Sequence, residues 1–283
     1  MMSYLVLPHL RVQQANIYNA AFLIGGPPVL ASWFMAHALG RELGIADKVK
    51  SLAFVLHSMT PLGERHYGRF NPQLRRGAAY TFGNMRKSDY LQGSINLSLQ
   101  PVACAHMEVS LVIGINETLG SSDVDKTAQW LHRGRLAGGL VSGMNRLTIK
   151  EELSDALQSI RTGYLVMDRR DLMESSAGNR AEKFVAALGT RPTAENGMGW
   201  LSATCLGYAA ITPFDPRSGA REGYRHAFAE PLVGLVQYRS LRDILENGED
   251  KYTLWRPEWI KPESSELEAF RIYQKLPHQP EKE

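Results

Sequence analysis

The chain has 283 residues, of which 44% are hydrophobic and 22% charged, a balance typical of a folded globular protein with a sizeable core. Its two cysteines exclude a disulfide-rich secreted scaffold and indicate the reducing cytoplasm. The net charge of +3 indicates no particular partner, and the sequence has neither an apolar run of membrane-spanning length nor a signal-peptide pattern. We therefore expect a cytoplasmic protein that makes no membrane contact.

The first predicted elements are an apolar strand and an apolar helix. The strand begins at Tyr4, and Pro28 suits the first turn of a helix over Val29–Leu43. This helix is apolar on nearly every side. The pair therefore predicts a βα unit whose helix, with Trp33 and Phe34, is buried against a sheet.

Three amide side chains, Gln13, Gln14 and Asn16, lie where the first strand is expected to end. Amides donate and accept hydrogen bonds together, so they suit the mixed edges of unpaired bases. The same residue types also suit a simple turn, and the sequence alone favours neither interpretation.

A basic, glycine-rich segment follows a second strand predicted over 51–59. Between residues 61 and 88 one acid, Glu64, accompanies six cations, which are Arg65, Arg69, Arg75, Arg76, Arg86 and Lys87. Aromatic residues are interleaved with them. Cations bind phosphates and aromatic faces stack on bases, so we predict an extended loop or hairpin that contacts nucleic acid. The plainer alternative is a solvated loop with a few anchoring aromatics.

The clearest alternation in the sequence runs from 102 to 115 and predicts a strand. Ser121 then suits the start of a helix, which Gly138-Gly139 would end. Near that end, Arg133 and Arg135 fit two roles, bracing the last carbonyls of the helix or reaching a phosphate. Backbone N–H groups at the glycines could bind a phosphate, although a helix cap and a tight turn is the plainer interpretation.

A further strand over 163–167 completes the order strand, helix, strand, excursion, strand, helix, strand. This is the order of an α+β, ferredoxin-like βαββαβ unit, which leaves one sheet face free for a ligand. We expect residues 1–190 to form this core, with the basic insert at about 61–100. Residues 191–283 are expected to form a C-terminal extension packed on the core, ending in a helix over 263–276.

The sequence offers no motif for a metal, a cofactor or a nucleophile. No nucleophile elbow, Walker motif, Cys-x-x-Cys or paired histidines occur, and Gly197-Met198-Gly199 lacks the third glycine of a dinucleotide fingerprint. We therefore expect no catalytic residue, metal or cofactor. Two other functions fit the residues, a metal-independent endoribonuclease that uses His57 or His106, and a protein-interaction adaptor.

Several stretches together resemble one family, the Csy-two, or Cas-five, subunit of type I-F CRISPR surveillance complexes. They are LVLPHLRVQQAN at 5–16, PPVLASWFMAHALGRELGI at 27–45, AHMEVSLVIGI at 105–115, RLAGG at 135–139, GWLSATCLGYAAITP at 199–213 and PLVGLVQYRSLRDIL at 231–245. The resemblance implies an RNA-recognition-type ferredoxin-like core with an inserted hairpin.

The resemblance also implies a non-catalytic subunit that holds the 5′ handle of a guide RNA. Its implied partners are the CRISPR backbone subunit, the large subunit and target DNA in the assembled complex, for antiviral defence or guided transposition. By position in the shared motifs, the implied RNA contacts are Gln13, Asn16 and Arg135, together with the basic insert.

Overall fold

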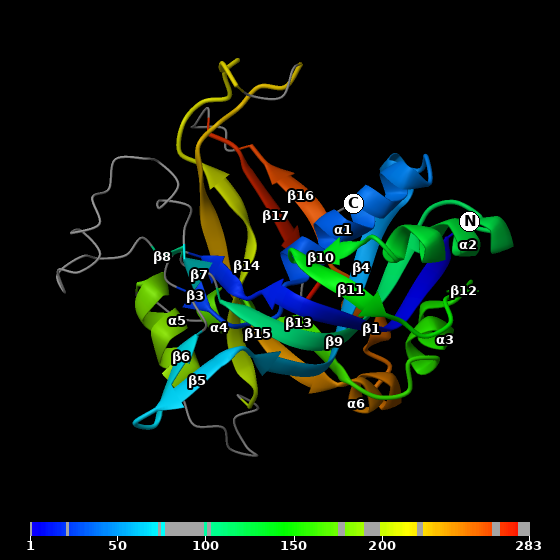
Figure 1. The fold of residues 1–283 in the computed structure, drawn as a ribbon, viewed down its shortest axis with the longest axis horizontal. Helices are drawn as coiled ribbons and strands as arrows, with labels where there is room; N and C mark the ends of the chain where they lie inside the picture. The colour runs from blue at the N-terminus through cyan, green and yellow to red at the C-terminus, as the bar shows by residue number, and fades with distance from the viewer. Residues whose placement is uncertain are drawn as a thin grey trace, which may run out of the picture.

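The computed structural model describes residues 2–20, 23–72, 75–76, 99–100, 103–174, 179–189, 199–219, 223–261 and 267–276. Within these residues the chain forms an α+β fold with few helices, one curled, mostly antiparallel sheet of eleven strands and three separate two-stranded sheets. Figure 1 shows the arrangement. Arg86 and Lys87 of the predicted RNA contacts lie outside the described residues.

The centre of the sheet is built from the N-terminal half of the chain. Its elements are β1 (Ser3–Asn16), α1 (Val29–Glu42), β4 (Val49–Pro61), β9 (Cys104–Ile115), α2 (Ser121–Leu131) and β11 (Gly139–Gly143). The four strands lie in the order β11-β1-β9-β4, and each pair of neighbours is antiparallel. The strand that returns after α2 is therefore β11.

The prediction that residues 163–167 supply this returning strand was wrong. Those residues belong to β13 (Tyr164–Asp168), which pairs with β4 on the other side of the central strands.

The glycines of β11 allow this strand to pack closely against β1. A Cβ on Gly139 would lie 2.6 Å from the backbone nitrogen of Ala15, so β11 can approach β1 only without a side chain there.

Helices cover the two faces of the central strands to different extents. On one face, α1 and α2 cover the main core, where Leu5, Leu7, Phe54 and Leu111 are fully buried. On the other face, α3 (Leu153–Gln158) and α6 (Leu241–Glu246) cover a smaller core that includes Val6, Val55 and Val112. This second cover is short, because both helices have only six residues.

The C-terminal half continues the same sheet beyond β4 in the order β13-β15-β14-β17-β16. The added strands are β14 (Leu201–Ala210), β15 (Ala229–Ser240), β16 (Arg256–Ile260) and β17 (Ala269–Tyr273). The remaining helices among the described residues are α4 (Asp171–Glu174), α5 (Arg180–Gly189) and two 3-10 helices, η1 (Ala46–Lys48) and η4 (Asp250–Tyr252). The short strands are β2 (Tyr18–Ala20), β3 (Leu23–Ile24), β5 (Gly63–His66), β6 (Arg69–Pro72), β7 (Arg75–Arg76), β8 (Leu99–Gln100), β10 (Arg135–Leu136) and β12 (Thr148–Lys150).

Two predictions from the sequence are wrong, one in the C-terminal half and one in α1. Residues 269–273 form the strand β17 where a terminal helix was predicted, because Ile272 and Gln274 are both buried at a spacing of two. Phe34 is 45% exposed and stacks on Phe270, whereas its neighbour Trp33 is buried as predicted.

Among the described residues, no helix is both long and apolar enough to cross a membrane.

Gln274 connects the C-terminal strands to β13 through its side-chain amide. Its Oε1 accepts from the Asp168 N–H at 2.7 Å, and its Nε2 donates to the carbonyls of Thr253 at 2.7 Å and Val166 at 3.1 Å. The side chain is 1% exposed, so water cannot replace these hydrogen bonds.

We predict that Gln274→Leu lowers the free energy of unfolding by about 2–4 kcal/mol, because buried backbone groups lose their partners. Denaturant unfolding measures the change. The control is Gln158→Leu on the exposed side of α3, which should stay within about 0.5 kcal/mol of the wild-type protein. Equal stability of the two variants would contradict a structural role for Gln274.

Candidate nucleic-acid interface

One end of the second sheet face is left uncovered by α3 and α6. Along β9, Val112 and Ser110 are buried on this face, but Glu108 is half buried and His106 is exposed. The pairing sets Ser58 opposite Glu108 and Thr60 opposite His106, which continues the polar surface onto β4. The covered face therefore becomes a solvent-facing polar face along the same strands.

A shallow cleft of about 310 Å³ lies on this polar face. Its polar lining comes from four strands, with Arg11 and Gln13 of β1, Ser58 and Thr60 of β4, His106 and Glu108 of β9, and Ser142 of β11. Hydroxyl, amide, imidazole, guanidinium and carboxylate groups thus face one small area, and the Glu108 carboxylate is paired with His9. Together they can donate and accept hydrogen bonds and can attract an anion.

Arg11 is the cation of this cleft. Its Cα partner across the sheet is Glu108, but that carboxylate contacts His9 Nδ1 at 2.6 Å. A Cβ on Gly143 would lie 2.6 Å from a guanidinium nitrogen of Arg11, so this side chain lies over the bare backbone of β11. Arg11 makes no ion pair with another described residue, and its exposed guanidinium is available to an anionic ligand.

A network of two histidines lies next to the cleft and reaches it through Glu108, which contacts His9. The rings of His9 and His57 stack with centroids 4.1 Å apart, and His57 Nε2 lies 2.6 Å from the Ser110 hydroxyl. That hydroxyl also accepts the backbone N–H of His9 at 2.9 Å. It can therefore give its own hydrogen to a neutral His57 ring.

Irregular pairing of β1 and β4 produces this network. The β1–β9 register shifts between Leu7 and Leu10, where Pro8 has no N–H to donate and His9 takes a φ of 52°. The β4–β9 register shifts between Leu56 and Ser58, which leaves His57 outside the regular pairing. The two irregularities bring His9 and His57 together.

Burial of the His57 ring, followed by the charge of His9, lowers the pKa of His57 from 6.5 to about 4, while Glu108 opposes the shift. His57 is consequently neutral at physiological pH. Its folded pKa lies below the unfolded value, so the unfolded chain binds more protons between about pH 6.5 and pH 4. His57 therefore lowers stability as the pH falls through that window.

The structure separates the three predicted amides. Gln13 lines the cleft and is exposed. Gln14 has a φ of 56°, and its backbone N–H points to His106 Nδ1 at 3.4 Å. Asn16 forms a local turn, because its Oδ1 accepts the Tyr18 N–H at 2.9 Å. Of the three, Gln13 is the one that the structure places in the cleft.

The sequence Arg135 to Gly139 forms a β-hairpin turn between β10 and β11. Ala137 and Gly138 both have positive φ, of 49° and 76°, as a two-residue hairpin loop requires. The prediction of a helix cap at these glycines was therefore wrong, whereas the predicted tight turn is confirmed. The Ala137 carbonyl accepts the Asn16 N–H at 2.7 Å and holds this turn against the end of β1.

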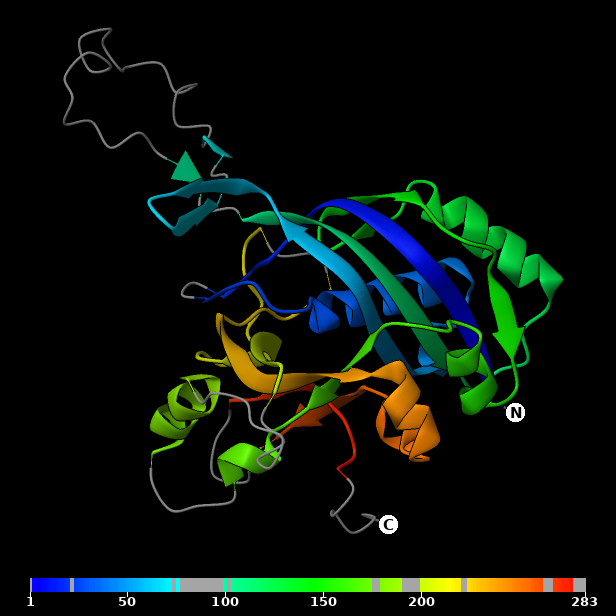
Figure 2. The same cartoon turned by 90° about the horizontal axis from the view of Figure 1, so that it is seen from below.

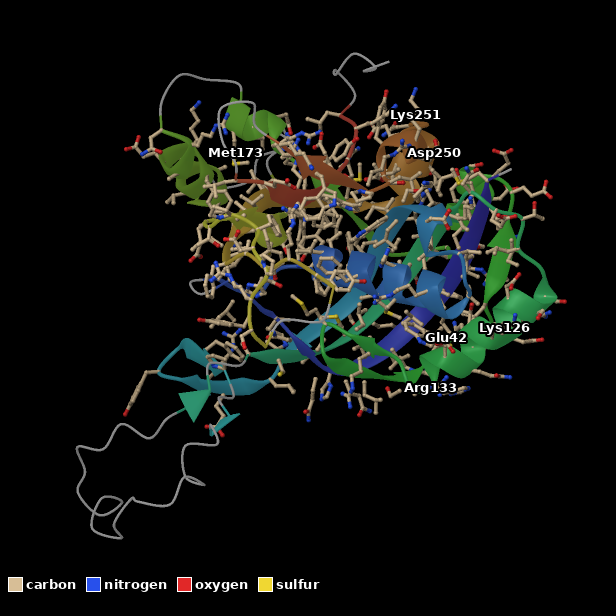
Figure 3. All side chains as sticks on the ribbon, turned by 90° about the horizontal axis from the view of Figure 1, so that it is seen from above. Glu42, Lys126, Arg133, Met173, Asp250 and Lys251 are labelled. Atoms are coloured by element: carbon tan, nitrogen blue, oxygen red, sulfur yellow. The ribbon has the colours of Figure 1, made fainter. Side chains whose placement is uncertain are left out.

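Arg133 and Arg135 have different neighbours. Arg133 pairs with Glu42 of α1 at 3.4 Å, and Figure 3 shows the two side chains together. Arg135 donates to the Gly138 carbonyl at 3.2 Å, inside its own turn. Both side chains are exposed, but neither lines the cleft.

The described part of the basic insert begins with a hairpin that continues from β4. Figure 2 shows β5 and β6 extending from the end of β4, away from the body of the protein. Arg65 and Phe70 face each other across this hairpin and are exposed, and Tyr67 at its tip is 94% exposed. Arg69, Arg75 and Arg76 lie in β6 and β7.

Arg11, Ser58, Thr60 and Ser142 are members of this site that were not predicted from the sequence. A signal for Arg11 was available, because the polar residues 9, 11 and 13 alternate with the apolar residues 10 and 12. Such alternation predicts a polar face on the first strand. The hydroxyls carried no comparable signal, since only the pairing of β4, β9 and β11 with β1 brings them together.

One protein-family model matches most of the N-terminal two thirds of the chain. The model of the CRISPR-associated protein family Cas_Csy2 matches residues 5–189, which include most of β1, the cleft and the turn at Gly138. The chain belongs to the Cas_Csy2 family. No curated protein matches the chain. The predicted resemblance to a Csy-two subunit is thereby confirmed, and this Cas_Csy2 protein is a subunit of a CRISPR-associated complex.

We predict that His57→Gln reduces the loss of stability on acidification, because it removes a group that the unfolded state protonates below about pH 6.5 and the folded state protonates only near pH 4. The free energy of unfolding is measured at pH 7 and pH 4.5 for the wild-type protein and the variant. The exposed His132→Gln serves as the control and should lose as much stability as the wild-type protein. Equal losses in all three proteins would refute the lowered pKa of His57.

Proposed function

We propose that this Cas_Csy2 protein is a non-catalytic subunit of a type I-F CRISPR surveillance complex and binds the 5′ handle of the guide RNA. The observation that carries the proposal is the polar end of the sheet face, where Arg11 and Gln13 share a cleft. An exposed cation and an exposed amide there provide a phosphate contact and a base-edge contact.

The order of the central strands supports an RNA-recognition-type, ferredoxin-like core. The strands β11-β1-β9-β4 are antiparallel, and α1 and α2 pack on one face while the cleft lies on the other. In such RNA-binding modules, single-stranded RNA lies on the open sheet face. We propose the same role for the face that carries Arg11.

The hairpin β5–β6 extends this surface. It follows β4 directly, and β4 contributes Ser58 and Thr60 to the cleft. Arg65 supplies charge, and the exposed rings of Tyr67 and Phe70 offer faces on which bases can stack. We propose that the handle passes from the cleft to this hairpin and to the remaining insert.

The histidine network favours binding over cleavage. Ser110 is fully buried, and the lowered pKa of His57 leaves its ring neutral near pH 7, without the second proton that a general acid gives up. A metal-independent endoribonuclease needs such an acid beside its base. We propose instead that His9 and His57 shape the floor on which RNA lies.

The proposed assembly follows from the family. We propose that residues 1–190 bind the handle and that residues 191–283 extend the sheet as a platform for the backbone and large subunits. Target DNA is bound after these subunits have joined, and the complex acts in the cytoplasm. The two free, buried cysteines, Cys104 and Cys205, are consistent with that compartment.

We predict that Arg11→Ala weakens binding of a single-stranded guide-RNA handle about tenfold, because one charge-assisted contact is lost. The slope of log affinity against log salt should fall by about 0.7, the value of one phosphate contact on a single strand. Fluorescence anisotropy at several salt concentrations measures both. The control is Lys126→Ala on the exposed side of α2, outside the cleft.

The same titration on Arg75→Ala/Arg76→Ala tests the insert, and a denaturing gel of the recovered RNA tests cleavage. Weaker binding in both variants, with intact RNA, supports the proposed path. Unchanged affinity and salt slope for Arg11→Ala would contradict the cleft as the binding site. RNA cut without metal by the wild-type protein, but not by His57→Gln, would contradict the non-catalytic role.

A further inference from the structure

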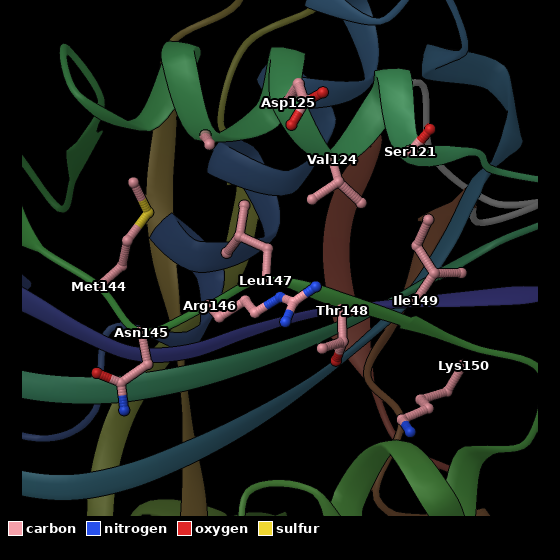
Figure 4. A pocket seen from close by; sticks show the side chains of 11 residues that line it. Ser121, Val124, Asp125, Met144, Asn145, Arg146, Leu147, Thr148, Ile149 and Lys150 are labelled. Atoms are coloured by element: carbon pink, nitrogen blue, oxygen red, sulfur yellow. The ribbon is translucent and has the colours of Figure 1, made fainter.

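A second cleft lies between α2 and the segment 144–150, which ends in β12 (Figure 4). Its volume is about 670 Å³, within the roughly 300–1,000 Å³ of ligand clefts in proteins. None of the residues that line the polar cleft around Arg11 lines this one. The two clefts are therefore separate features of the surface.

One wall of this cleft is a sheet edge. β12 pairs with β1 through Thr148↔Val6, Ile149↔Leu5 and Lys150↔Tyr4, and it pairs with no other described strand. Its outer edge therefore has no strand partner within the described chain. An edge of this kind accepts an added strand, because unpaired N–H and C=O groups favour backbone pairing.

The opposite wall is one face of α2. Ser121, Val124, Asp125 and Ala128 line it with the 3, 4 and 7 residue spacing of a single helical face. The small side chain of Ala128 leaves room beside the edge strand. Val124 and Ala128 are half buried against the main core, so this wall offers apolar contact to an occupant.

The floor is apolar and the rim is cationic. Met144 and Ile149 extend the apolar surface, and Figure 4 shows Val124 and Leu147 directed toward each other across the cleft. Arg146 is exposed at the rim and Lys150 is half exposed. Neither forms an ion pair with a described residue, and the lining contains one acid, Asp125.

We propose that this groove binds an extended, acidic segment of a partner protein, which adds as a strand to β12. Alternate side chains of the segment pack on the apolar floor, and its carboxylates pair with Arg146 and Lys150. Nucleic acid suits the groove less well. No aromatic residue lines it, so bases would find no ring to stack on.

The test uses the full chain and a fluorescein-labelled probe peptide of alternating glutamate and valine. Fluorescence anisotropy should detect saturable binding of this probe. A second peptide, with proline at the central valines, cannot pair with an edge strand and should bind much more weakly. Two variants change the groove, Arg146→Glu/Lys150→Glu by charge and Ala128→Leu by filling it. Thermal unfolding checks that both fold.

The matched control is Lys50→Glu/Lys126→Glu, which changes the net charge equally at two exposed positions outside the groove. We expect the groove charge reversal to weaken probe binding at least about tenfold, Ala128→Leu to weaken it also, and the control to change it less than about twofold. The handle RNA should bind all three variants as it binds the wild-type protein.

Three results would overturn the groove as a peptide site. The first is no probe binding up to millimolar concentration, and the second is an equal loss in the control. The third is displacement of the probe by handle RNA, with RNA binding that is lost in Arg146→Glu/Lys150→Glu. That result would assign the groove to nucleic acid. Because Arg11 lines a different cleft, failure of the peptide site leaves the RNA titration of Arg11→Ala unaffected, and the reverse also holds.

Discussion

The arrangement of this protein depends on the alternation of side chains along β1. The strand has β9 on one side and both β11 and β12 on the other, so its side chains must point to one sheet face or the opposite one. Leu5, Leu7 and Val12 enter the core under α1 and α2. The opposite face is covered only as far as the short helices α3 and α6 reach, and Val6 lies beneath them.

Beyond the reach of α3 and α6, the same strands carry polar groups. Register shifts in the β1–β9 and β4–β9 pairing position some of these groups. The breaks at Pro8 and at His57 bring two imidazole rings together over the buried hydroxyl of Ser110. His9 holds the Glu108 carboxylate and thereby leaves Arg11 for another anion. The exposed Arg11 guanidinium lies over β11 in the same cleft as Glu108 and suits the binding of an anionic ligand. The buried Ser110 hydroxyl favours a structural role for the histidine network over a catalytic one.

Strong local periodicity in the sequence was enough to predict most of the central elements. The strand at 104–115, the helix from Ser121 and the helix α1 all follow from spacing and end signals, and the family model confirms the resemblance. The returning strand β11 was missed because its glycines signal a turn when seen alone, whereas here they permit close contact with β1. The alternation of residues 9, 11 and 13 indicated a polar face that includes Arg11, but Ser58 and Ser142 come from distant segments, and only the pairing of the strands brings them beside it. The strand β17 was mistaken for a helix since Phe270 and Tyr273 match a helical spacing, but the burial of Ile272 and Gln274 decided the structure.

The central claim is that the polar end of the sheet face is where single-stranded RNA lies. Ultraviolet cross-linking of the handle RNA to the wild-type protein, followed by mass spectrometry of the linked peptides, tests it most directly. The account predicts that linked peptides come from 9–16 and 104–110, together with the hairpin at 63–72. Cross-links confined to α1 and α2 on the opposite face would contradict it.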